Sequence, residues 1–259
     1  QPQQQQMLET ILSQPQKAFL LQGVTGSGKT EVYFHALQHV LHQGKGALFI
    51  VPEIALTPQL VSRLQTAFPG EPVVVWHSAL GPAARQNAHA LLLAGSVRVA
   101  IGARSLLFAP MPQLGLIVVD EEHDGSFKNG ESPRYHGRDV ALWRAQNEGA
   151  LAILGSATPS MESLHNVACG KLVPLFLDER FGGRPLPSVE IIDLRGRKQH
   201  LPMRRRDRAI SEGHKVAVLA APLQQAMQQC LEQGEQTMLL LNRRGYSASV
   251  LCVGCGEIV

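Results

Sequence analysis

The chain has 259 residues, with 24 Lys and Arg against 21 Asp and Glu, which gives a formal net charge of +3. A hydrophobic fraction of 44% and a charged fraction of 17% exclude a disordered chain. No apolar run approaches the roughly 18 residues of a membrane span. The small net charge does not by itself indicate nucleic acid. Length and composition indicate one large globular domain or two small ones.

The two ends of the sequence indicate a piece of a longer protein. The chain begins at Gln1 without a basic and apolar leader, and it ends just after a C-x-x-C-G motif. Its cysteines, Cys169, Cys230, Cys252 and Cys255, lack the pattern of a secreted disulfide framework. We therefore expect a reducing, cytoplasmic setting.

About the first 160 residues alternate short apolar runs with helical segments. Strands are predicted at residues 18–22, 47–51, 73–76, 97–101, 116–119 and 151–154, and helices at residues 30–42 and from Thr57-Pro58 onward. The runs are continuously apolar, as in strands that are buried on both faces. This pattern predicts an α/β fold with a parallel sheet flanked by helices.

The composition changes after about residue 178. Residues 179–216 are rich in Arg, Gly and Pro and have poor periodicity, apart from a short strand expected at residues 189–192. A helix at residues 222–233 and a strand at residues 237–241 follow. We predict a first α/β domain at residues 1–178, a connection at 179–216 and the start of a second α/β domain at 217–259. The glutamine run at residues 3–6 is interpreted as a frayed end.

The strongest motif is a phosphate loop, G-x-x-x-x-G-K-T, between the first predicted strand and the first helix. It comprises Gly23, Val24, Thr25, Gly26, Ser27, Gly28, Lys29 and Thr30. Glycines let backbone N–H groups close around phosphates, and a helix N-terminus attracts negative charge. Lys29 is predicted to bind the β- and γ-phosphates of ATP, and Thr30 to hold Mg²⁺. The alternative is a Gly-rich turn that matches by chance.

A second motif, DEEH, follows the predicted strand at residues 116–119. Asp120 and Glu121 are expected at the carboxyl edge of the sheet, where such proteins bind ligands. Asp120 is predicted to position Mg²⁺, and Glu121 to activate the attacking water as a general base. Ser156 and Thr158 follow a further strand and could sense the nucleotide. Without the other two motifs they would be interpreted as ordinary strand-to-helix punctuation, with Thr158 as an N-cap. A solvated turn would explain the carboxylates alone, but less well beside a phosphate loop.

Eight segments then occur in chain order: GVTGSGKTE, VPEIALTPQ, HS, GARSLLFAP, DEEHD, RYHGRD, GSATP and LNRRGY. This series resembles the PriA family of superfamily 2 DNA helicases, which restart stalled bacterial replication forks. The resemblance implies a RecA-like, ATP-binding helicase lobe with Mg²⁺, 3′-to-5′ helicase activity and the start of a second lobe. It also implies single-stranded and forked DNA, primosome proteins and single-stranded-DNA-binding protein as partners, no membrane, and a cytoplasmic location.

The resemblance further implies which residues contact DNA or couple it to ATP hydrolysis. They are Thr57, His77, Arg104, Ser105, Phe127, Lys128, Arg134, Tyr135, Ser156 and Thr158. Packing of a loop remains the alternative for Phe127 and Tyr135, and solvation for Arg104. Gln5 and Gln6 are candidates for a position near the adenine.

Cys252 and Cys255 resemble half of a zinc knuckle. Tetrahedral Zn²⁺ needs four ligands, so we expect zinc in the longer protein rather than in this chain alone. A redox pair is disfavoured because no thioredoxin-like context follows. Three histidines at helical spacing, His35, His39 and His42, are interpreted as surface residues. For Arg243 and Arg244, nucleic-acid contact and a solvated turn both remain open.

Three other functions remain as hypotheses. They are a different superfamily 2 translocase such as a double-strand DNA pump, a phosphate-loop kinase or signalling switch, and a lobe that only docks replication proteins. The presence of Lys29, Thr30, Asp120 and Glu121 together argues against the last. Because the arginine finger of the family belongs to a later motif, the chain alone is expected to hydrolyse ATP poorly.

Overall fold

The computed structural model describes residues 2–14, 17–52, 57–77, 80–177, 188–192 and 220–240, and the structural statements below concern these residues. The chain divides into two units, Gln1–Pro185 and Leu186–Val259. The first unit holds the sheet and the site. Among its described residues, the second contains helix α7 (Ala221–Glu232), which confirms the helix predicted at residues 222–233.

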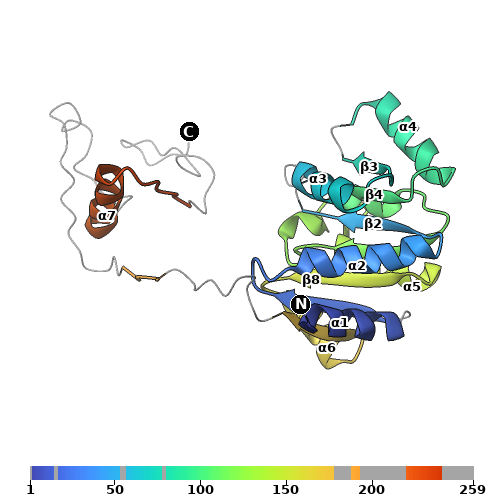
Figure 1. Ribbon diagram of the computed structural model, residues 1–259, viewed down its shortest axis with the longest axis horizontal. Helices are drawn as coiled ribbons and strands as arrows, with labels where there is room; N and C mark the ends of the chain where they lie inside the picture. The colour runs from blue at the N-terminus through green and yellow to red at the C-terminus, as the bar shows by residue number, and fades with distance from the viewer. Residues whose placement is uncertain are drawn as a thin grey trace, which may run out of the picture. The chain divides into compact units, whose positions relative to one another are not determined.

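A seven-stranded sheet forms the centre of the first unit (Figure 1). Its strands are β1 (Ala18–Gly23), β2 (Gly46–Ile50), β3 (Val73–Trp76), β4 (Val99–Gly102), β5 (Leu114–Val119), β8 (Leu151–Ser156) and β9 (Leu172–Leu177). They lie in the order β3-β4-β2-β5-β8-β1-β9, and every neighbouring pair is parallel. The parallel sheet predicted from the apolar runs is therefore confirmed.

Helices cover both faces of the sheet. One face packs against α1 (Pro2–Ser13), α2 (Lys29–His42) and α3 (Thr57–Ala67), and the other against α4 (Pro82–Leu93), α5 (Gly137–Glu148) and α6 (Met161–Ala168). Between β5 and α5 the chain forms a short 3₁₀ helix, η3 (Gly125–Phe127), and then a hairpin in which β6 (Lys128–Asn129) pairs with β7 (Tyr135–His136). A further 3₁₀ helix, η2 (Arg104–Phe108), follows β4.

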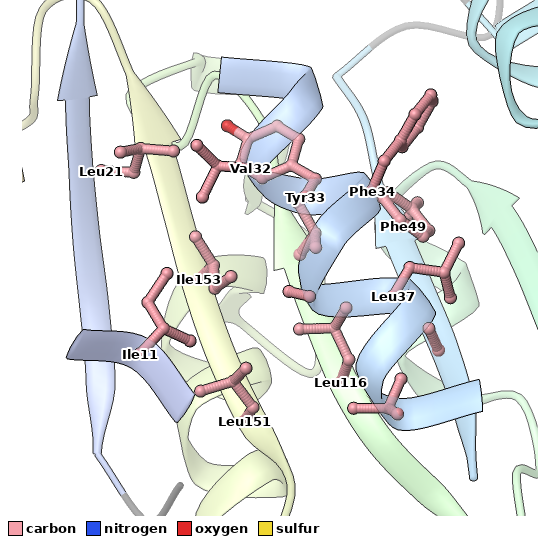
Figure 2. Packing of buried hydrophobic residues seen from close by; sticks show 14 of the residues in the cluster. Ile11, Leu21, Val32, Tyr33, Phe34, Leu37, Phe49, Leu116, Leu151 and Ile153 are labelled. Carbon is pink, nitrogen blue, oxygen red and sulfur yellow. The ribbon is translucent and has the colours of Figure 1, made fainter. Parts of the chain in front are cut away.

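Alternate residues of each strand feed the two layers of the core. On β2, Ala47 and Phe49 belong to the cluster beneath α1, α2 and α3, whereas Leu48 and Ile50 belong to the opposite cluster. Figure 2 shows α2 laid across the sheet, with Leu37 close to the strands. Each large apolar side chain that is fully buried contributes about 1.5–3 kcal/mol to stability, so these two clusters hold the strands and their ends in place.

Two elements escape the sequence pattern. Strand β9 lies at the edge of the sheet, and Pro174 interrupts its apolar run, which argues against a central strand but is tolerated at an edge. Helix α1 forms where a frayed end was expected, because Met7 and Ile11 pack into the core. A run of glutamines conceals this apolar spacing of four residues.

Two predicted strands differ in the other direction. Residues 189–192 and the described part of the run at 237–241 form no strand. Neither has a neighbouring strand among the described residues, and an unpaired strand leaves its backbone N–H and C=O groups without partners. An apolar run alone was therefore not enough to predict a strand at either place.

Gly102, at the end of β4, lies against the neighbouring strand β3. A Cβ at this position would collide with the backbone carbonyl oxygen of Trp76, which cannot rotate away. We therefore predict that Gly102→Ala lowers the free energy of unfolding by about 1–3 kcal/mol, measured by urea denaturation. Gly130→Ala is the matched control, because open space surrounds Gly130. Equal destabilisation by the two variants would contradict the prediction.

Candidate nucleotide-binding site

The phosphate loop connects β1 to α2 and adopts the backbone conformation that its glycines allow. Gly26 and Gly28 have φ angles of 80° and 90°, a region that side chains disfavour. Gly28 is the N-cap of α2, so the loop opens at the N-terminus of that helix. The partial positive charge of the helix end therefore faces the loop, as an anion site requires.

Two polar groups in this loop fit a phosphate ligand. Lys29 is buried, and its Nζ donates a hydrogen bond to the carbonyl oxygen of Gly23 at 2.8 Å. Ser27 is 2% exposed, and its hydroxyl has no hydrogen-bond partner. A buried hydroxyl without a partner costs free energy. A loop that carries such a hydroxyl beside a buried ammonium is suited to an anion.

Asp120 is brought to the loop by the order of the strands. Strand β5 is separated from β1 only by β8, so the ends of all three meet at one edge of the sheet. The hydroxyl of Tyr33, on α2, donates to Oδ1 of Asp120 at 2.9 Å, and the backbone N–H of Glu121 donates to the same oxygen at 3.1 Å. Tyr33 therefore links the phosphate-loop helix to the acidic motif.

Tyr33 is a site residue that the sequence reasoning missed. It is 1% exposed, and burial together with the Asp120 carboxylate raises its pKa well above the ordinary value, so the hydroxyl keeps its proton and remains a donor. In the sequence it is one of several apolar and aromatic residues on the inner face of α2. No spacing distinguishes a core tyrosine from one whose hydroxyl holds a carboxylate.

Glu121 has an unusual backbone and an altered acidity. Its φ angle is 50°, which is rare outside glycine, and Oε2 lies 3.7 Å from Nδ1 of His123. Burial, and then the charge of Asp120, raise the pKa of Glu121, while Lys29 and His123 oppose the shift. A carboxylate with a raised pKa is a stronger base, which suits the role predicted for Glu121.

A cleft of about 670 Å³ lies over these groups. Its lining is formed by Gln4, residues 24–31, Arg63, Asp120 and Glu121. All of the predicted phosphate-loop residues except Gly23, and both predicted carboxylates, thus line one cleft. A nucleoside triphosphate and a divalent cation match both the size of the cleft and its donor set.

The cleft also shows which glutamine reaches the site. Gln4 lines it, and its Nε2 donates to the carbonyl oxygen of Gly28 at 3.3 Å. Of the two adenine candidates, Gln6 is exposed on α1, and the side chain of Gln5 lies outside the described part of the structure. Arg63 on α3 was not predicted either, and it pairs with Glu31 at 3.0 Å at the rim. Within a glutamine run and an ordinary amphipathic helix, neither residue carries a sequence signal.

Ser156 joins the acidic motif to the end of β8. It is fully buried, and its Oγ lies 2.8 Å from Nδ1 of His123 and accepts the backbone N–H of Thr158 at 3.0 Å. Thr158 itself is exposed. Ser156 therefore contacts His123 of the acidic motif, two positions after Glu121, and its role as a nucleotide sensor stays a prediction.

The loop at residues 125–136 is held by residues that were candidates for DNA contact. Arg104 donates through Nη1 to the carbonyl oxygens of Ser126 at 3.1 Å and Lys128 at 2.5 Å, and its guanidinium lies 6.0 Å from the ring centre of Tyr135. Phe127 is fully buried in the core, as expected if it packs the loop onto the domain rather than contacting DNA. In this structure both side chains anchor the loop.

The remaining candidates for DNA contact follow the strands at the same edge of the sheet. His77 comes directly after β3, Ser105 lies in η2 after β4, and Thr57 begins α3. Lys128 and Arg134 are exposed on the hairpin. Tyr135 is half-buried and packs edge-to-face on the exposed ring of Phe108, with ring centres 5.3 Å apart.

The zinc candidates Cys252 and Cys255 lie outside the described residues, as do Arg243 and Arg244. Within the part of the chain that the structure describes, no group of three or more His, Cys, Asp or Glu could hold a metal ion. His35 and His42 are exposed on α2. None of the described helices is long and apolar enough to cross a membrane.

The parallel sheet, the phosphate loop and the carboxylates at its edge define a RecA-like nucleotide-binding domain. The chain matches the DEAD/DEAH box helicase family over residues 1–167 and belongs to that family. Membership implies the use of ATP and Mg²⁺, for which the cleft provides a buried lysine, an unpartnered serine hydroxyl and two carboxylates.

Curated relatives match almost the whole chain. The chain is 40% identical over 96% of its length to the replication restart protein PriA of Bacillus subtilis, and 41% identical over 100% of its length to that of Synechocystis. It spans 29% and 30% of the length of these proteins. The resemblance noted from the motifs is therefore confirmed as similarity to part of PriA.

Solved structures confirm the fold. RecG bound to a three-way DNA junction matches 71% of this chain and 24% of its own, with a TM-score of 0.53 and 23% identity. The DUF1998 helicase MrfA bound to DNA and AMPPNP matches 71% of this chain and 27% of its own, with a TM-score of 0.52 and 20% identity. Both are distant in sequence, so the similarity concerns the fold alone.

The Tyr33 hydroxyl can be tested by its removal. Tyr33→Phe keeps the ring in the core but removes a donor from Asp120, so we predict a loss of about 0.5–1.5 kcal/mol in the free energy of unfolding. The matched control is Tyr135→Phe, because no hydrogen bond of the Tyr135 hydroxyl contributes to the site. Chemical denaturation of both variants measures the difference. Equal stability of Tyr33→Phe and the unmodified protein would contradict the role assigned to the hydroxyl.

His136 makes stability depend on pH. It caps α5, since its Nδ1 accepts the backbone N–H of Arg138 at 3.3 Å, and burial and the Arg138 charge lower its pKa below the ordinary 6.5. The folded state therefore binds fewer protons than the unfolded state. The contribution of the cap is complete above pH 6.5 and is lost as the pH falls through the lower, folded pKa.

We predict that His136→Asn flattens this dependence, because asparagine caps a helix without titrating. The free energy of unfolding measured between about pH 5 and pH 8 would show it. A variant whose stability still fell with pH as steeply as that of the unmodified protein would exclude His136 as the source.

Proposed function

We propose that the chain is the ATP-binding lobe of a 3′-to-5′ DNA helicase that acts in replication restart. In this proposal residues 1–178 form the lobe, residues 179–216 connect it to a second lobe, and residues 217–259 begin that lobe. The observation that carries it is the hydrogen bond from Tyr33 on the phosphate-loop helix to Asp120 of the DEEH motif. It joins the two halves of an ATP site in one rigid unit. The similarity to PriA supports the more specific proposal, a DNA helicase that acts in replication restart.

Each residue of the cleft has a separate role in the proposed hydrolysis of ATP. Lys29 and the loop N–H groups bind the phosphates, while Thr30 and Asp120 hold the cation. Glu121 orients the attacking water and accepts its proton, and its raised pKa favours that transfer. Bound ATP with Mg²⁺ would supply the phosphoryl group and the charge neutralisation that its transfer needs.

DNA contact is proposed for the edge of the sheet beyond the cleft. His77, Ser105, Lys128 and Arg134 follow strands or lie in the hairpin at this edge, and short polar or basic side chains there bind phosphates without regard to sequence. Single-stranded and forked DNA are the proposed substrates. Primosome proteins and single-stranded-DNA-binding protein are the proposed partners, in the bacterial cytoplasm.

Zinc belongs to the same proposal. Cys252 and Cys255 would supply two of the four ligands that tetrahedral Zn²⁺ requires. The spacing of two residues between the cysteines and the similarity to PriA support it.

The test is the ATPase activity of the protein that carries this chain, without DNA, with single-stranded DNA and with forked DNA. We predict stimulation by DNA, and a fall of at least about 100-fold in the stimulated rate for Lys29→Ala, which loses a charge on the transferred phosphoryl group. Lys171→Ala, which removes an exposed lysine outside the cleft, serves as the control.

Two outcomes would favour other functions. Turnover that is the same with and without DNA would point to a kinase or a signalling switch. Stimulation by duplex DNA without strand separation on forks would point to a double-strand DNA pump.

A further inference from the structure

A buried ion pair lies directly behind the acidic motif, and the chemistry proposed for the cleft does not use it. Glu122 has a fully buried side chain, that of Arg138 is 4% exposed, and Nη1 of Arg138 lies 3.2 Å from Oε2 of Glu122. Two charges lose their hydration when they are buried together, so a pair of this kind is weak evidence for stability. Its place beside Glu121 suggests a different use.

The carboxylate of Glu122 also fixes the first turn of α6. Oε1 accepts the backbone N–H of Ser160 at 2.7 Å, and Oε2 accepts the hydroxyls of Ser160 at 2.9 Å and Ser163 at 2.8 Å. Arg138 completes the cluster by donating to Oγ of Ser160 at 2.6 Å. A buried polar network whose members are all satisfied is rigid, so the acidic motif, α5 and α6 are held to one another.

Glu122 also controls the backbone of the motif. Its N–H donates to the carbonyl oxygen of Gly155 at 3.0 Å, and the residue before it, Glu121, has a φ of 50°. A non-glycine residue keeps such a strained conformation only where its surroundings impose it. The direction of the Glu121 side chain therefore depends on how firmly Glu122 is held.

Arg138 connects the acidic motif to the hairpin formed by β6 and β7. It lies two residues after the end of β7, and its N–H is capped by His136, the last residue of that strand. The hairpin connection at residues 130–134 is exposed throughout, and the loop is fastened to η2 by Arg104. The remaining carboxylates near Arg138, Asp139 at 3.3 Å and Glu162 at 3.9 Å, are exposed. A displacement of the hairpin therefore reaches Glu122 through the arginine.

We propose that Glu122 and Arg138 are positioning residues that set the orientation of Glu121 according to the position of the loop at residues 125–136. A strand of nucleic acid that moves this loop would thereby change the rate at which Glu121 activates water. The inference rests on the proposed function, in which DNA stimulates ATP hydrolysis. Neither residue touches the nucleotide cleft.

The experiment compares DNA-stimulated and DNA-free ATP turnover in the protein that carries this chain. Arg138→Met is expected to reduce the ratio of the two rates by at least about 5-fold, with a change of less than about 2-fold in the KM for ATP. Glu122→Gln combined with Arg138→Met leaves no unpaired buried charge and so keeps the fold. Since the pair acts as one unit, the double variant should lose no more of the ratio than the worse single variant.

Arg144→Met is the matched control. Arg144 is also a buried arginine of α5 with an ion pair, to Glu148 at 2.6 Å, but its other bonds go to the carbonyl oxygens of Leu107 and Ala109 and not to the acidic motif. It should lower stability and keep the ratio.

The possible outcomes distinguish a failure of the positioning role from a failure of the proposed function. An unchanged ratio in the double variant, or the same loss in Arg144→Met, would overturn the positioning role. So would a KM for ATP that rises as much as the ratio falls. An unmodified protein without DNA stimulation would instead overturn the proposed function itself.

Discussion

Parallel strands send all of their carboxyl ends to one edge of a sheet, and this constraint decides where the groups of the candidate nucleotide site lie. Burial of both faces fixes the strands, and the order β5-β8-β1 places three loops side by side at that edge. The phosphate loop, the acidic motif and Ser156 meet there because of strand order, although about 130 residues separate the first from the last. Side chains need only short reaches to complete the site.

Beneath this edge the fold carries polar groups that an apolar core would otherwise exclude. Tyr33 and Asp120 form one such contact, and Glu122 and Arg138 form another. Each satisfies its hydrogen bonds locally, which removes the penalty of an unpaired buried group. The first ties the phosphate loop to the carboxylates, and the second ties the carboxylates to the elements that follow. Together they make the edge a single rigid piece rather than a set of independent loops.

The sheet and the two halves of the ATP site could be predicted because their signals are local. A continuous apolar run predicts a strand that is buried on both faces. A glycine-rich loop before a helix predicts a backbone with positive φ angles that can surround a phosphate. Tyr33, Gln4 and Arg63 could not be predicted, because their roles depend on which side chain of a helix faces a distant loop. Strand β9 was missed because Pro174 interrupts its apolar run, and a proline is compatible with a strand at the edge of a sheet but not with a central one.

The same distinction explains the residues of the hairpin loop. Sequence resemblance marks Arg104 and Phe127 as belonging to a functional segment, and the structure shows that their side chains hold that segment in place. A motif identifies where a function resides but does not separate the residues that contact a ligand from those that support them. Only burial and hydrogen-bond partners make that separation.

The two tryptophans give the molecule a built-in optical readout. Trp143 is 66% exposed on α5, the helix that begins beside Arg138, whereas Trp76 is half-buried at the end of β3. Indole emission depends on the polarity around the ring, so the two residues emit differently and sample different parts of the domain. Movement of α5 can therefore be followed by intrinsic fluorescence without any attached dye. In a Trp76→Phe variant, Trp143 on α5 is the remaining source of indole emission.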